Sequence, residues 1–162
     1  MVSDALLERV RAAAAAVADP ELPPLTIEDL GILRGVRLDG DAVEVSITPT
    51  YSGCPAMREI TAAVEAAARA AGADRVRVRL VLSPAWGTDA LTDAGRRKLA
   101  AMGIAPPDPA GGTEALFGAR PTPCPRCGSA DTERLSEFGA TACKALHRCR
   151  ACREPFEAFR CH

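Results

Sequence analysis

Cysteine is the residue type in this 162-residue sequence whose number and spacing point most directly to chemistry. Six of the seven cysteines follow residue 120, and four of them form two Cys-x-x-Cys pairs, Cys124 with Cys127 and Cys149 with Cys152. Each pair can hold a metal from one tight turn, and the 21 residues between the pairs approach the spacing of zinc ribbons. Four thiolates suit tetrahedral zinc first and an iron centre second. The sequence therefore predicts a four-cysteine site with structural zinc.

Two further cysteines in the tail lie outside these pairs, and two interpretations of them stay open. In the first, Cys143 and Cys161 pack as small apolar side chains or lie in solvent. In the second, Cys143, Cys161 and His162 are additional ligands, and the two cysteines join Cys54 in holding or passing on an iron–sulfur unit. The number of thiols left over in a chain that is expected to lack disulfides motivates the second interpretation.

Cys54 lies apart from the other cysteines, in the segment Thr48–Met57, TPTYSGCPAM. The segment separates an alternating apolar pattern, typical of a strand, from a pattern with helical spacing. Pro55 suits a first helical position, so Cys54 is predicted at or near the helix N-cap, where a thiol pKa can fall to roughly 3.5–7.5. We predict a thiolate that binds metal or acts as a nucleophile. The alternative is a buried cysteine used as a small apolar residue.

The sequence around this segment predicts the elements that position it. Asp39-Gly40-Asp41 between two alternating apolar runs indicates a β-hairpin. A helix is expected from the Cys54 segment to about Ala71, and a strand at 76–82 then lies parallel to the second hairpin strand. Further helices are predicted at Ser3–Ala18 and Thr92–Met102. The expected fold class is α+β, with a small mixed three-stranded sheet, helices on one face, and a four-cysteine zinc-ribbon-like domain after it.

The domain organisation follows from shifts in composition along the chain. Residues 1–105 are predicted to form the α/β domain, residues 106–123 a linker rich in proline and glycine, and residues 124–162 the zinc-ribbon-like domain. From Arg120 onward, eight basic and five acidic residues give a formal charge of +3. A segment of this size is close to the ~40-residue limit below which a metal or another staple is usually needed.

Composition and charge also exclude several function classes. A formal net charge of −1 gives no general attraction to nucleic acid or to an anionic membrane. Apolar stretches fall short of the ~18 residues of a membrane span, and no secretory signal is evident, so we expect a cytoplasmic protein with reduced cysteines. The sequence has no helical carboxylate–histidine motif for two irons and no glycine-rich nucleotide loop. The chain therefore cannot build the usual carboxylate–histidine di-iron site.

Particular segments carry a family resemblance. DPELP at residues 19–23, IEDLGIL at residues 27–33, and TPTYSGCPAM before a helix resemble the iron–sulfur assembly family. This resemblance covers roughly Leu6 to Ala105. The C-terminal segments FGATACKAL and EPF and the Cys-His terminus are similar to the accessory-subunit family, D or J, of bacterial phenylacetyl-CoA epoxidases.

The resemblance implies an accessory subunit of a multicomponent oxygenase in aerobic phenylacetate catabolism. Such a subunit would mature or repair an iron–sulfur or di-iron centre, with epoxidase subunits as partners, including the iron–sulfur flavoprotein reductase or the di-iron subunit. Structural zinc and a transient iron–sulfur cluster are the implied cofactors. In family terms, Cys54 matches the reactive cysteine, and Asp19, Glu21, Thr48 and Thr50 match polar positions near it.

Other functions stay open on the residues alone. A zinc ribbon can serve as a nucleic-acid or protein adaptor without cluster chemistry. A tail with a formal charge of +3 attracts nucleic acid only weakly, so nucleic acid is not the expected partner. A thiol oxidoreductase would need a resolving thiol, and none lies at Cys-x-x-Cys spacing from Cys54. A membrane is not an expected partner, and homodimer formation is left open.

Overall fold

The computed structural model describes residues 4–108 and 121–160. The chain divides into two compact units, Met1–Trp86 and Gly87–His162, and each unit is described by itself. Within the described ranges, no helix combines the length and the hydropathy that a membrane crossing requires.

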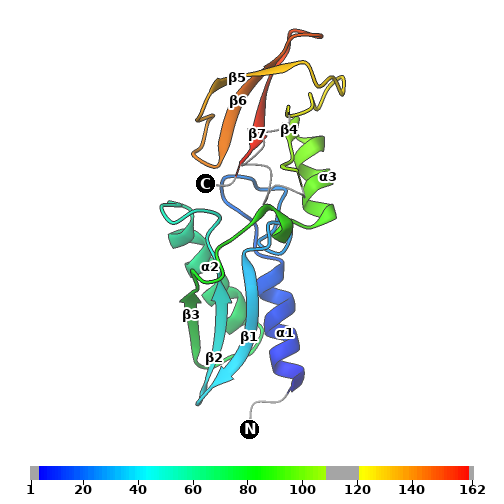
Figure 1. The fold of residues 1–162 in the computed structure, drawn as a ribbon. Helices are drawn as coiled ribbons and strands as arrows, with labels where there is room; N and C mark the ends of the chain where they lie inside the picture. The colour runs from blue at the N-terminus through cyan, green and yellow to red at the C-terminus, as the bar shows by residue number, and fades with distance from the viewer. Residues whose placement is uncertain (1–3, 109–120, 161–162) are drawn as a thin grey trace. The chain divides into compact units, whose positions relative to one another are not determined.

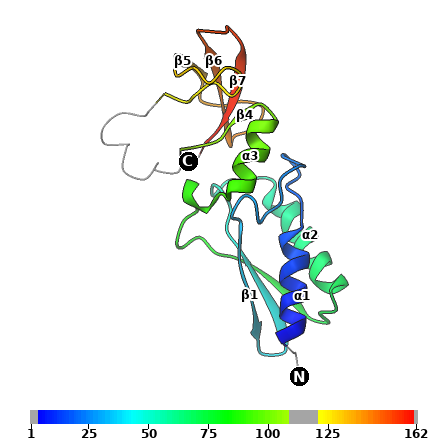
Figure 2. The same ribbon diagram turned by 90° about the vertical axis from the view of Figure 1, so that its right-hand side faces the viewer.

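The first unit is a three-stranded sheet with two helices on one of its faces (Figures 1 and 2). Its strand order is β1-β2-β3, with β1 antiparallel to β2 and β2 parallel to β3. The predicted α+β class with a mixed three-stranded sheet is confirmed. The elements are α1 (Asp4–Ala15), β1 (Leu33–Asp39), β2 (Ala42–Ile47), α2 (Met57–Ala70) and β3 (Val76–Leu80).

Local sequence explains these elements. Gly40 closes the β1–β2 hairpin with a φ of 64°, a left-handed conformation that glycine adopts without steric cost. Helix α2 has an apolar face with helical spacing, and that face is buried together with the side chains of β2. The buried residues of α2 are Met57, Ile60, Val64 and Ala68.

Two turns stabilised by side chains connect α1 to β1. Oδ1 of Asp19 accepts hydrogen bonds from the amides of Glu21 and Leu22, at 2.8 and 2.9 Å. Thr26 and Asp29 bond each other reciprocally, since each side chain accepts from the other residue's amide at 3.0–3.1 Å. Helix α1 ends at Ala15, three residues before the predicted end, and the predicted cap Ser3 lies outside the described residues.

The second unit contains a four-stranded sheet in the order β4-β7-β6-β5. Strand β4 pairs parallel with β7, and the other neighbours are antiparallel. Thr92 caps α3 as predicted, because its hydroxyl accepts from the Gly95 amide at 3.0 Å. The elements are a short 3-10 turn (Thr88–Ala90), α3 (Asp93–Ala101), β4 (Ile104–Ala105), β5 (Thr132–Ser136), β6 (Lys144–Cys149) and β7 (Pro155–Phe159).

The division between the units falls after Trp86, whereas the shift in composition predicted a boundary after residue 105. Residues 87–105 belong with the cysteine-rich tail because β4 pairs with β7 through Ile104–Glu157 and Ala105–Ala158. A two-residue strand with such a distant partner leaves no pattern in the sequence. Most of the predicted linker, residues 109–120, lies outside the described residues.

Candidate metal centre and candidate thiol site

Four cysteine sulfurs of the second unit converge at one place. Cys124 and Cys127 precede β5, Cys149 ends β6, and Cys152 lies in the turn before β7. Their Sγ atoms all lie within 4.8 Å of one another. The Sγ–Sγ distance is 3.8 Å for Cys124 and Cys152 and 3.6 Å for Cys127 and Cys149. Metal–sulfur bonds of ~2.3 Å around a tetrahedral ion place the sulfurs ~3.8 Å apart. The four thiols therefore fit one tetrahedral metal ion.

Tight turns hold each pair of cysteines. The Gly128 amide donates to the Cys124 carbonyl at 2.9 Å, and Gly128 has a φ of 75° that favours glycine. In the second turn, the Cys152 amide donates to Sγ of Cys149 at 3.5 Å. This hydrogen bond is the main cause that lowers the pKa of the Cys149 thiol to about 7. A thiolate is thus accessible near neutral pH, and thiolate is the form that binds metal.

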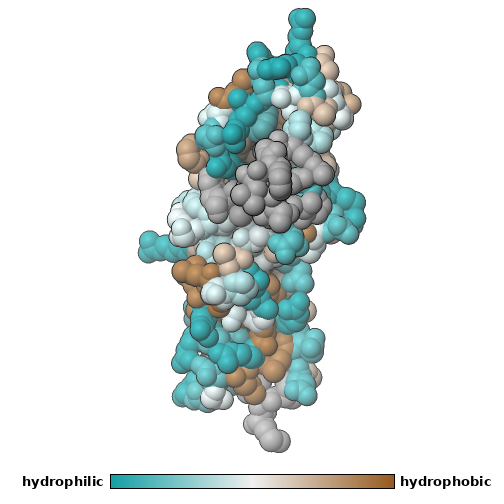
Figure 3. Space-filling view, viewed as in Figure 1, coloured by the Kyte–Doolittle hydropathy of each residue, from teal (hydrophilic) through white to brown (hydrophobic). Residues whose placement is uncertain are grey.

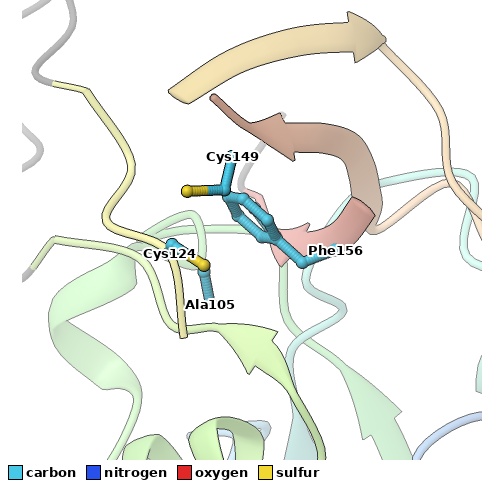
Figure 4. Close-up of a cluster of buried hydrophobic side chains, with 5 residues drawn as sticks. Ala105, Cys124, Cys149 and Phe156 are labelled. Atoms are coloured by element: carbon cyan, nitrogen blue, oxygen red, sulfur yellow. The ribbon is translucent and has the colours of Figure 1, made fainter. Parts of the chain in front are cut away.

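The metal centre is packed against a small apolar core. Cys124 and Cys149 are buried and contribute to one cluster with Ala105, Phe156 and Ala158, with Cys152 packed against it. Figure 4 shows Cys124, Cys149, Ala105 and Phe156 gathered from separate segments of the chain. The β4 residue Ala105 therefore takes part in the environment of the metal centre.

Of the additional ligands suggested by the sequence, Cys143 lies within the described residues and is not part of this group. Within the described part of the chain, the only residues grouped as a metal site are the four cysteines. Cys143 is buried, with its sulfur 3.0 Å from the Thr141 hydroxyl. His147 stacks on Phe156 with ring centroids 5.4 Å apart, and burial lowers its pKa. Cys161 and His162 lie outside the described residues.

Cys54 occupies the loop between β2 and α2 and is half-buried. Its amide donates to the Tyr51 carbonyl at 3.2 Å, and its carbonyl accepts from the Met57 amide at 3.3 Å. The backbone amides of Ala56 and Met57 are also close enough to favour its thiolate form. The N-cap of α2 is Ala56, two residues later than predicted. The thiol nevertheless lies close enough to the start of α2 for the Ala56 and Met57 amides to influence its pKa.

The prediction of a lowered pKa for Cys54 is wrong. Burial is the largest cause and raises the pKa of this thiol, because a buried thiolate loses its hydration. The Ala56 and Met57 amides lower it in part, while the carboxylates of Glu21 and Asp19 raise it further. Cys54 is therefore a thiol that stays protonated at neutral pH, and its sulfur lies close enough to two carboxylates to feel their charge.

The two acidic residues come from the turn that follows α1. Asp19 is only 7% exposed, and burial raises its pKa while the amides of Leu22 and Glu21 lower it. The turn fixes Glu21 next to Asp19, since both backbone hydrogen bonds go to the same carboxylate oxygen of Asp19. The fold thus brings residues 19–21, which are distant in sequence, electrostatically close to Cys54.

Thr48 and Thr50 are both buried at the start of the Cys54 loop. The Thr48 hydroxyl accepts from Nε of Arg34 at 2.9 Å, and the same guanidinium donates to the Pro84 carbonyl at 3.2 Å. Arg34 thereby connects β1, the Cys54 loop and the segment after β3. Arg34 was not among the predicted site residues, because no sequence motif predicts that an arginine at the start of a strand makes such contacts.

The fold and the two thiol sites define a class of protein: a small α+β domain with a loop cysteine, joined to a β-sheet unit that has a four-cysteine metal site. Residues 7–84 match the family described as "Iron-sulfur cluster assembly protein", and residues 108–160 match the "PaaD zinc beta ribbon domain". The D subunit of the "Putative 1,2-phenylacetyl-CoA epoxidase" of Escherichia coli (strain K12) is 47% identical over 145 residues, which cover 90% of this chain and 87% of that protein. The chain belongs to the family of phenylacetyl-CoA epoxidase D subunits.

Two solved structures are similar to part of this chain. The crystal structure of Domain of Unknown Function DUF59 from Bacillus anthracis has a TM-score of 0.53 and 25% identity, and the match covers 59% of this chain and 92% of that one. A conserved hypothetical protein from Thermotoga maritima has a TM-score of 0.49 and 29% identity, with 60% and 94% of the two chains covered.

Proposed function

We propose that this chain is an accessory subunit of a phenylacetyl-CoA epoxidase system in aerobic phenylacetate catabolism, and that it matures or repairs a metal centre of its partners. The client would be an iron–sulfur or di-iron centre, on the iron–sulfur flavoprotein reductase or on the di-iron subunit. The observation that carries the proposal is the environment of Cys54, whose half-buried thiol is influenced by the amides of Ala56 and Met57 and by the carboxylates of Asp19 and Glu21.

This arrangement suits a transient ligand better than a permanent one. The raised pKa of Cys54 keeps the thiol protonated and slow to oxidise, since the thiolate is the reactive form. An arriving iron ion or cluster displaces the proton, because metal binding requires the deprotonated sulfur. The carboxylates of Asp19 and Glu21 attract the cation, and a single protein thiolate leaves the other positions of the cargo available to a client.

The four-cysteine centre has a different role in this proposal. Cys124, Cys127, Cys149 and Cys152 would hold zinc, a redox-inactive ion whose four thiolate ligands leave no open position for water or substrate. Zinc would supply folding free energy to the second unit. A nucleic-acid adaptor is less well supported, because Arg148 and Arg150 both bind the carboxylate of Glu133 and leave little net charge to attract phosphates.

The proposal is tested by anaerobic transfer of iron from the full chain to the apo reductase subunit. Wild type, Cys54→Ala and the matched control Cys143→Ala are each loaded with ferrous iron and sulfide and mixed with the apo reductase. We expect wild type and Cys143→Ala to restore the visible absorbance and electron-transfer activity of the reductase. Cys54→Ala should neither retain loaded iron nor accelerate the recovery.

Two outcomes would contradict the proposal. Equal recovery with Cys54→Ala and wild type would remove the thiol from the mechanism and leave a protein adaptor. Recovery at the rate of free iron and sulfide with all three proteins would remove the reductase as client. The same experiment on the apo di-iron subunit then decides whether any maturation role survives.

A further inference from the structure

Strand β3 forms one edge of the first unit's sheet (Figure 1). Among the described residues its backbone pairs with β2 alone. An edge strand presents a row of unpaired amides and carbonyls that another strand can join. The edge is long enough to matter, because the pairing with β2 extends from Val76 to Leu80 and is prolonged by a hydrogen bond at Val81.

The hydrogen bonds between β2 and β3 identify which backbone groups of β3 face away from the sheet. The carbonyl of Arg75 accepts from Val43, and the amide of Val81 donates to the carbonyl of Ile47. In a parallel pair, residues that bond the same neighbour alternate along the strand, so the odd-numbered residues of β3 bond β2. The amides and carbonyls of Val76, Val78 and Leu80 therefore point away from the sheet.

The side chains of β3 divide into a basic row and an apolar row. Arg77 and Arg79 lie level with Glu44 and Ser46, on the face opposite to the buried Val45. Their side chains are 60% and 57% exposed, although Arg77 also binds Asp39 and Arg79 lies 3.7 Å from Glu44. A guanidinium has five N–H donors, so each arginine keeps donors for a further carboxylate.

The apolar row of β3 is unusually exposed at its C-terminal end. Leu80 and Leu82 are 52% and 62% exposed. Figure 3 shows a hydrophobic area beside this end of β3 on a face that is otherwise largely hydrophilic. Because β2 and β3 are parallel and Leu80 lies beside Ile47, this end of β3 is also the end at which the Cys54 loop begins.

We propose that β3 is a docking edge that takes an extended segment of a partner protein in which acidic and apolar residues alternate. The segment would hydrogen-bond to the outward backbone groups of Val76, Val78 and Leu80. Its acidic side chains would lie opposite Arg77 and Arg79, where cross-strand pairs of opposite charge are favourable. Its apolar side chains would cover Leu80 and Leu82.

Charge decides between such a partner and a second copy of this chain. If β3 paired with its own copy, the arginine row of one strand would lie against the arginine row of the other, and like charges opposite each other are destabilising. An acidic strand removes this repulsion and gains ion pairs instead. The inference does not depend on cluster chemistry, since it concerns a binding edge and not the Cys54 thiol.

The test uses the full chain and a short synthetic peptide that alternates valine with glutamate, with a valine–lysine peptide of equal length as control. Amide hydrogen exchange measured with and without the peptide should show new protection at Val76, Val78 and Leu80. The glutamate peptide should bind saturably, with an affinity that falls as salt is added. The lysine peptide should bind at least roughly tenfold more weakly.

Two variants sharpen the test. Val78→Pro removes an outward amide without breaking a hydrogen bond to β2. It should lower the affinity for the glutamate peptide by roughly five- to tenfold, which corresponds to the loss of about one hydrogen bond. Arg79→Gln leaves the backbone intact and should lower the affinity for the glutamate peptide roughly two- to fivefold. Arg9→Gln, in α1, should leave this affinity unchanged. Circular dichroism confirms that each variant is folded.

The proposal fails if neither peptide binds saturably, if both bind equally, or if protection appears at the odd-numbered amides instead. Sedimentation of the chain alone supplies a further decisive outcome. A dimer that Val78→Pro dissociates would show that a second copy occupies the edge, contrary to the inference.

Discussion

The two units use cysteine in opposite ways. In the second unit, four sulfurs within 4.8 Å of one another form a closed set of ligands that satisfies a metal completely. In the first unit, Cys54 is a single half-buried thiol with two carboxylates nearby, which leaves most of a metal's ligands to come from elsewhere. In the proposed function, the closed site would retain its metal and the open one would release its cargo.

The two sites also differ in how the chain assembles them. Each Cys-x-x-Cys pair lies within one turn, so its geometry is local and the antiparallel β6–β7 pairing brings Cys149 and Cys152 into place. The Cys54 site depends on the distant turn at Asp19 and Glu21. Loss of one ligand should therefore destroy the closed site outright, whereas a substitution at Asp19 or Glu21 should only adjust the open one.

The largest expected effect is the loss of one ligand from the closed site. Cys149→Ser removes a buried thiolate ligand, and structural zinc contributes ~10–16 kcal/mol to the folding of a small domain. We expect the bound metal to be lost and the unfolding transition of the second unit to disappear, while that of the first unit is retained. Elemental analysis and scanning calorimetry measure the two effects.

Cys143→Ser is the matched control for this prediction, because Cys143 is buried in the same unit but lies outside the four-cysteine group. It should keep a full complement of metal. Loss of metal from Cys143→Ser, or retention by Cys149→Ser, would break the distinction between ligand and packing cysteines.

A smaller effect is expected where the chain packs against the closed site. Ala105 in β4 is 2% exposed and lies in the cluster with Cys124 and Cys149. Ala105→Leu adds volume to a filled core, which typically costs ~1–3 kcal/mol. In scanning calorimetry, the unfolding transition of the second unit should move to lower temperature, and the unfolding transition of the first unit should not move. A shift of the first transition alone would contradict the assignment of residues 87–105 to the second unit.

A still smaller effect is expected in the first unit, at Arg34. Its guanidinium binds the Thr48 hydroxyl and the Pro84 carbonyl, but the residue is largely exposed. Arg34→Met keeps the aliphatic stem and removes these bonds, so we expect a loss of ~1 kcal/mol in the unfolding free energy, measured by urea denaturation. Arg58→Met, for an exposed arginine of α2, should change stability less. Equal effects would mean that Arg34 has no special role beside the Cys54 loop.

The sequence predicted most of the closed site and less of the open one. Two Cys-x-x-Cys pairs encode their own turns, and the hairpin, the α2 pattern and the Thr92 cap are equally local signals. The pairing of β4 with β7 and the contacts of Arg34 arise only when distant segments meet. The pKa of Cys54 was mispredicted for the same reason. Its helix amides could be anticipated from Pro55, but burial and the charges of Asp19 and Glu21 come from the folded chain.

The smallest predicted effect tests whether the open site is tuned by these charges. Glu21 is the carboxylate with the larger influence on Cys54, and it raises the pKa of the thiol. Glu21→Gln removes the negative charge and keeps the size of the side chain, so the thiolate becomes easier to form. The pH profile of Cys54 alkylation should shift to lower pH, and below the pKa the rate should rise about two- to fivefold.

The alkylation experiment uses protein whose four-cysteine centre is loaded with metal, so that Cys54 is the thiol followed by peptide mass spectrometry. Glu65→Gln is the matched control, because Glu65 lies in α2, pairs with Arg69 and has a side chain that is 44% exposed. It should leave the profile in place. An unchanged profile for Glu21→Gln would mean that burial alone sets the pKa of Cys54. The acidic turn would then act only on the arriving cation, and iron affinity would fall in Glu21→Gln without any change in thiol reactivity. A shift to higher pH would contradict the electrostatic account, because removing a negative charge near the sulfur can only favour the thiolate.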